Sequence, residues 1–81
     1  MRKHYMTICV MNNTEVTHIK RKNYLEVTFE QACSNGFKTL ICDDSGNILS
    51  NDGFNNAEVV FFLDFLRRNI EVMKQESEGL L

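Results

Sequence analysis

The sequence predicts a small α+β domain, a two-layer sandwich in which one long helix packs on one face of an antiparallel sheet. Short segments with strand-like alternation occupy the first fifty residues, turn-forming residues separate them, and apolar residues recur with a helical period from Asn56 to Glu76. The expected order is β-β-(β)-α-β-β-α. It fits a single domain of residues 1–76, followed by a frayed tail of residues 77–81.

The first two predicted strands form a hairpin. Residues 4–11 carry apolar side chains on both faces, which indicates a strand inside the sheet. Asn12-Asn13 supplies the turn, because asparagine tolerates positive φ. Residues 14–20 return as a strand rich in β-branched residues, and its polar, basic end predicts an edge position.

The segment after this hairpin carries two competing signals. Residues 25–29 alternate between apolar and polar, as in a short strand. Thr28 and Gln31, however, have the spacing of a capping box, and Gly36 can end a helix. We therefore expect a two-turn helix from Phe29 to Asn35.

The second half of the chain has clearer boundaries. Residues 37–43 predict a strand, residues 43–47 a turn, and residues 48–50 a short returning strand. Asn55 caps the long helix, Glu58 completes its capping box, and Phe54 and Val59 form a hydrophobic staple.

The long helix carries two apolar stripes, although a helix that covers a small domain usually needs one. At 100° per residue, one broad face contains Val59, Phe62, Leu63, Leu66, Ile70 and Met73. A second, narrower stripe contains Phe61, Phe65 and Val72. This second stripe is either an interface or a part of the core covered by the rest of the chain.

The function predicted from these features is that of a small non-enzymatic protein-interaction module. Aromatic residues beside an arginine are typical of interface hot spots, and the simplest partner is a second copy of the chain in a homodimer. Another version is a phage or mobile-element inhibitor that binds a host or defence (anti-CRISPR-like) protein with an acidic patch. The predicted interface residues are Phe61, Phe65, Arg68, Val72, Asp43, Asp44, Asp52 and Glu58.

Charge asymmetry supports an alternative, a nucleic-acid-binding protein that uses a basic N-terminal hairpin. Residues 1–24 have a net charge of +4 and residues 25–81 a net charge of −6. Basic residues on two antiparallel strands would lie side by side, and a tyrosine could stack on a base. The acidic remainder disfavours phosphate binding. The residues of this alternative site are Arg2, Lys3, His18, Lys20, Arg21, Lys22 and Tyr24.

No motif in the sequence predicts catalysis, a cofactor or a metal. The histidines and cysteines lack the close spacing of structural zinc sites, and no nucleophile elbow or phosphate loop is present. The longest apolar run is far too short to cross a bilayer, and no secretory leader is visible, so we expect a cytoplasmic protein. Free cysteines at positions 9, 33 and 42 fit that compartment, and each is expected to fill the core.

Overall fold

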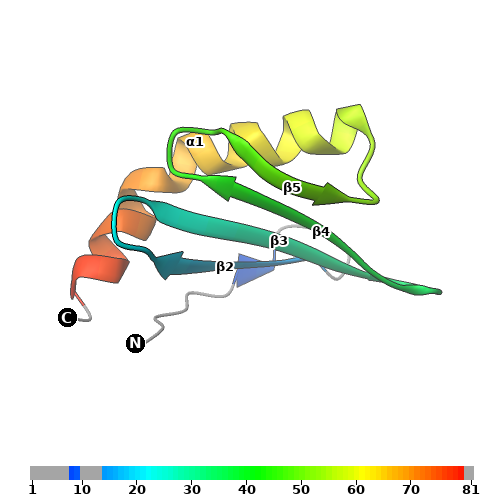
Figure 1. Cartoon of the computed structure of the whole chain (residues 1–81), viewed down its shortest axis with the longest axis horizontal. Helices are drawn as coiled ribbons and strands as arrows, with labels where there is room; N and C mark the ends of the chain where they lie inside the picture. The colour runs from blue at the N-terminus through cyan, green and yellow to red at the C-terminus, as the bar shows by residue number, and fades with distance from the viewer. Residues whose placement is uncertain (1–7, 10–13, 80–81) are drawn as a thin grey trace.

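The computed structural model describes residues 8–9 and 14–79, with side chains for residues 14–75. Figure 1 shows a twisted antiparallel sheet beside one long helix, so the predicted α+β class and two-layer arrangement are confirmed. The elements are β1 (Ile8–Cys9), β2 (Thr14–Lys20), β3 (Leu25–Cys33), β4 (Gly36–Asp43), β5 (Ile48–Asp52) and α1 (Asn56–Gly79).

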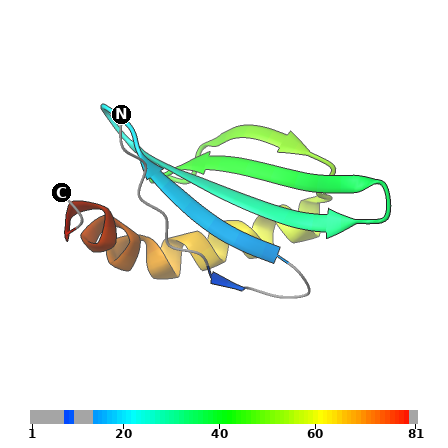
Figure 2. The same cartoon turned by 90° about the horizontal axis from the view of Figure 1, so that it is seen from below.

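The sheet follows the order of the chain, β1-β2-β3-β4-β5, and every neighbouring pair is antiparallel. Helix α1 covers one face, and no other described helix or strand covers the opposite face (Figure 2). The molecule measures 37 × 20 × 19 Å. Its long axis runs from the β2–β3 turn at one end to the β3–β4 turn at the other (Figure 1).

The core lies between the helix and the inner face of β2, β3 and β4. Val16, Phe29 and Leu40 are neighbours in register across these strands, and all three are fully buried. The ring of Phe29 stacks on that of Phe62 with 4.7 Å between centroids, and Phe54 meets Phe62 edge-on at 4.9 Å. The broad apolar face of α1 supplies the helix side of this core, as predicted.

The predicted helix from Phe29 to Asn35 is wrong, because residues up to Cys33 belong to the central strand β3. Val27 and Phe29 alternate inward and contact the core, while β2 and β4 pair with both edges of β3. A two-turn helix is marginal by itself, and it would forfeit both ladders and displace the Phe29 ring. Tertiary pairing therefore overrides the local capping signal.

The predicted positions of the first two strands in the sheet are wrong, because the strand expected in the interior lies at the edge and the strand expected at the edge lies in the interior. Strand β1 lies at the edge of the sheet, and β2 lies between β1 and β3. The basic end of β2 thus reflects the surface turn that follows it, rather than an edge position. The other predicted residues of the first strand and the Asn12-Asn13 turn lie outside the described residues.

The start of α1 is confirmed in detail. The Glu58 amide donates to Asn55 Oδ1 at 2.8 Å, and the Asn55 amide donates to Glu58 Oε1 at 3.0 Å, which is a complete capping box. Phe54 and Val59 are both buried, as a staple requires. The helix continues to Gly79, beyond the predicted end at Glu76.

Candidate functional site

The second stripe of α1 is divided by the fold. Phe61 and Val72 remain 47% and 51% exposed. Phe65 instead turns toward the core, where its ring meets Phe29 edge-on with 6.1 Å between centroids. The exposed stripe is therefore narrower than the sequence predicts, because its middle aromatic residue is partly used in the domain itself.

The stripe runs along one flank of the helix. On the other flank, Lys74 Nζ lies 3.6 Å from the carboxylate of Asp44 in the β4–β5 turn. Arg68 borders the stripe and is well exposed, with its Nε 2.9 Å from the Asp64 carboxylate one turn earlier. Val60 is also exposed, but it projects about 100° away from Phe61 around the helix.

The four acidic residues predicted to form one patch lie toward opposite ends of the sheet. Asp52 ends β5 and pairs in register with Thr39. Asp43 is four residues farther along β4, or about 13 Å in an extended strand. Glu58 lies in the first turn of α1 at the Asp52 end, and Asp44 follows Asp43 in the β4–β5 turn. The structure thus holds two separate pairs instead of one patch.

Most of these carboxylates already have local partners. Asp43 Oδ1 accepts bonds at 2.9 Å from the amides of Ser45 and Asn47. Desolvation by burial raises the pKa of Asp43, but these bonds, together with one from the Asn47 side chain and one from the Gly46 backbone, outweigh it, so the pKa of Asp43 is lowered. The backbone bond from Asn55, opposed by desolvation and assisted by Lys38, lowers the pKa of Glu58. Both acids stabilise a turn or a helix end.

Basic residues gather around a cavity of about 300 Å³ at the end of the sheet where β2 turns into β3. The end of β2 and the turn after it supply three cations and an aromatic ring. A fourth cation arrives from the distant helix, and one acidic residue from the β4–β5 turn completes the wall. The lining residues are Lys20, Arg21, Lys22, Asn23, Tyr24, Leu25, Asp44 and Lys74.

Two of the four cations have carboxylate neighbours. Arg21 Nε lies 2.9 Å from Glu26 Oε1, and Lys74 is near Asp44 as described above. Within the part of the chain that the structure describes, no ion pair involves Lys20 or Lys22. The pocket therefore keeps a net positive charge.

Some of the residues predicted for the alternative nucleic-acid site line this pocket, others do not, and one residue that was not predicted joins them. Lys20, Arg21, Lys22 and Tyr24 line this one pocket. His18 is fully buried on the inner face of β2 and does not reach the surface. Arg2 and Lys3 lie outside the described residues. Lys74, which the sequence analysis missed, also lines the pocket, because the fold places α1 beside the β2–β3 turn. No local sequence pattern indicates this contact.

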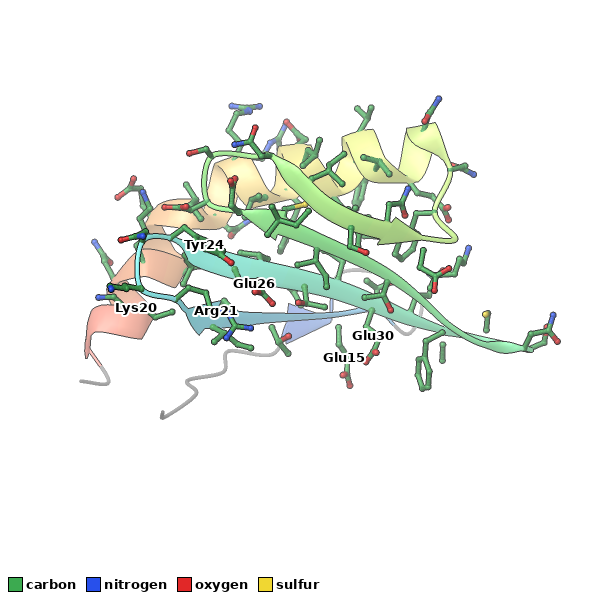
Figure 3. All side chains as sticks on the ribbon, viewed as in Figure 1. Glu15, Lys20, Arg21, Tyr24, Glu26 and Glu30 are labelled. Carbon is green, nitrogen blue, oxygen red and sulfur yellow. The ribbon has the colours of Figure 1, made fainter. Side chains whose placement is uncertain are left out.

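The open face of the sheet has the opposite charge. Glu15 on β2 and Glu30 on β3 are direct cross-strand partners, and both are exposed. Their side chains lie together on the face that the helix leaves uncovered, away from Lys20 and Tyr24 at the turn (Figure 3). This pair follows from the strand register and is invisible in the linear sequence.

The two described thiols differ. Cys42 is buried, and this burial, together with the nearby charge of Asp43, raises the pKa of its thiol to about 11. Cys33 is exposed at the end of β3, so its predicted place in the core is wrong. Among the described residues, no group of three or more histidine, cysteine or acidic side chains is placed to hold a metal ion.

No helix in the described part of the chain is long and apolar enough to cross a membrane. Comparisons with protein-family models, curated proteins and solved structures found no match for this chain.

Proposed function

We propose that this protein is a non-enzymatic interaction module that associates with a second copy of itself through the exposed flank of α1. The observation that carries the proposal is the pair of large apolar side chains, Phe61 and Val72, that remain about half exposed on a helix whose broad apolar face already packs against the core. Such side chains, bordered by Arg68, are typical of the centre of a protein interface.

The spacing of the stripe fits a two-fold symmetric pair of antiparallel helices. A two-fold axis between Leu66 and Arg67 places Phe61 of one copy opposite Val72 of the other. The same axis places Arg68 opposite the partly exposed Phe65, where an arginine can stack on an aromatic face. All these residues lie within about 60° of one another around the helix. One patch is therefore complementary to itself, as an isologous interface requires.

The inhibitor version has less support, because it needs the acidic residues to act together. Asp43 and Glu58 are engaged in their own turn and helix start, at opposite ends of the sheet. Self-association requires only residues that already lie on one flank.

The first experiment measures mass in solution by light scattering over a range of concentrations. The wild-type chain should approach twice its 9.4 kDa as concentration rises. The double variant Phe61→Asp, Val72→Asp should remain a monomer, because dimerisation would bury four unpaired carboxylates and place them in two facing pairs of like charge. The matched control is Val60→Asp, the same kind of change on the same helix but off the stripe, which should still dimerise.

A second experiment tests the geometry, in a Cys33→Ser background that removes the one thiol found exposed among the described side chains. Chains with Phe61→Cys mixed with chains with Val72→Cys should form a disulfide under mild oxidation. Chains with Phe61→Cys alone should not, because the two copies of residue 61 would lie about 16 Å apart along the helices. If the wild-type chain remains a monomer at high concentration, the proposal is overturned. Circular dichroism of all variants should be unchanged, which shows that the substitutions do not unfold the chain.

A further inference from the structure

We propose that the basic pocket at the β2–β3 turn binds the phosphate of a nucleotide, either free or at the end of a single strand, and that Tyr24 stacks on its base. This site is separate from the proposed dimer flank. It uses the turn between β2 and β3 and the C-terminal half of α1.

The cations approach the cavity from two directions. Lys20 ends β2, and Arg21 and Lys22 follow it in the turn, whose shape is held by the Arg21 amide donating to the Tyr24 carbonyl at 2.8 Å. Lys74 reaches the same cavity from α1. A phosphate group has several acceptor oxygens, and charged donors on more than one side can satisfy them together.

Asp44 sets the position of the helix-borne cation. Its Oδ1 accepts a bond at 3.4 Å from the Leu25 amide, and its Oδ2 lies 3.6 Å from Lys74 Nζ. An ammonium group has three donors, so Lys74 keeps donors for a phosphate while the carboxylate holds it at the mouth of the pocket. The negative charge of Asp44 also lowers the affinity of the pocket for an anion, so removing this charge should strengthen binding.

The size and surroundings of the pocket indicate a short ligand. A volume of about 300 Å³ is at the lower limit for ligand pockets, which suits a single nucleotide. The side chain of Tyr24 is 39% exposed in the pocket wall and offers a ring for stacking. Glu26, Glu15 and Glu30 make the adjoining sheet face acidic (Figure 3), so a long polyanion could not continue across it.

The test is a titration of the full chain, followed by amide chemical shifts at about 50 mM salt. The probes are adenosine 5′-monophosphate, adenosine, inorganic phosphate and a 5′-phosphorylated oligothymidylate. The monophosphate should shift the amides of residues 20–25, Asp44 and Lys74, and adenosine should not. A stronger effect of the free nucleotide identifies that source, and a stronger effect of the oligonucleotide identifies a strand end.

Variants distinguish a pocket from general charge. Lys22→Gln and Lys74→Gln should each weaken binding of the monophosphate by about tenfold or more, the loss expected for one charged hydrogen bond. Asp44→Asn keeps the acceptor for the Leu25 amide and should strengthen binding about threefold. The matched control is Lys38→Gln, since Lys38 pairs in register with Gln31, about 20 Å along β3 from Leu25. Its affinity should not change.

Three results would overturn the proposal: no shifts at the pocket with any phosphate-bearing probe, equal losses in the Lys22→Gln and Lys38→Gln variants, or inorganic phosphate binding as tightly as the nucleotide. These outcomes are independent of dimerisation, because the Phe61→Asp, Val72→Asp double variant leaves the pocket unaltered and should bind the nucleotide with wild-type affinity.

Discussion

Phe29 shows how a single side chain can join the two layers of this domain. It is fully buried on the central strand, stacks on Phe62 and meets the edge of Phe65, so its ring contacts two turns of α1. Phe37, near the β3–β4 turn, is 62% exposed and makes none of these ring contacts. The two phenylalanines should therefore contribute very differently to the free energy of unfolding.

We predict that Phe29→Ala lowers the free energy of unfolding by about 3–5 kcal/mol, because it removes a buried ring and leaves a cavity. Phe37→Ala, the matched change at an exposed site, should alter it by no more than about 0.5 kcal/mol. Urea unfolding followed by circular dichroism measures both. Comparable losses in the two variants would contradict the burial of Phe29 against the helix.

At the scale of elements, the start of α1 is fixed by a few polar contacts. The capping box of Asn55 and Glu58 satisfies two backbone amides, and Lys38 Nζ lies 3.4 Å from the same glutamate. The carboxylate also lies in the first turn, where the helix dipole favours negative charge. These contacts favour the ionised form of Glu58.

A pH dependence follows from the lowered pKa of Glu58. Since the folded pKa lies below the ordinary value of 4.5, the stabilisation is complete above that value and is lost as pH falls through the folded pKa. The free energy of unfolding should therefore fall more steeply below about pH 4.5 in the wild type than in Glu58→Gln, which keeps a capping side chain. Urea midpoints over this range measure the difference. Asp43, whose pKa is also lowered, contributes equally to both proteins, so parallel curves would contradict the role of Glu58.

Strands also differ in how firmly the molecule holds them. Strand β3 pairs on both sides and carries buried Val27 and Phe29, whereas β5 lies at an edge and all five of its residues are exposed. Local opening is easiest where few apolar groups are buried. The sheet should therefore loosen from the β5 edge inward.

At the scale of the whole molecule, we predict that amide hydrogen exchange is slowest at Val27 and Phe29 and faster by orders of magnitude along β5. Exchange of a fresh sample into heavy water, followed by nuclear magnetic resonance, measures this order. In the proposed dimer, amides of α1 should gain protection with concentration while those of β5 do not. Protection of β5 equal to that of β3 would indicate that something covers the β5 edge.

Several elements were predictable because their signals are local. The Asn55–Glu58 capping box fixed the start of α1, and the turn chemistry of residues 43–47 separated β4 from β5. Residues 29–33 were predicted incorrectly, because a local capping pattern competed with pairing to two distant strands, and only the pairing uses Phe29 well.

The candidate sites likewise include residues that the sequence predicted and residues that only the structure revealed. Consecutive residues Lys20, Arg21 and Lys22 were visible as a basic run, but Lys74 joins them from half a chain away. The helical period predicted that Phe65 lies on the exposed stripe, yet its ring contacts Phe29. The period gives the direction of a side chain around the helix, but it does not show how far the sheet extends beneath the helix.

The amino-acid sequence by itself determined the fold class, the long amphipathic helix with its start, and the separation of charge between the two ends of the chain, since periodicity, capping and composition act over a few residues. Tertiary structure alone decided that β3 continues as a strand to Cys33, that Glu15 faces Glu30, and that Lys74 meets the basic turn. Each of these depends on register and crossing angle, which are set by packing between segments far apart in the chain.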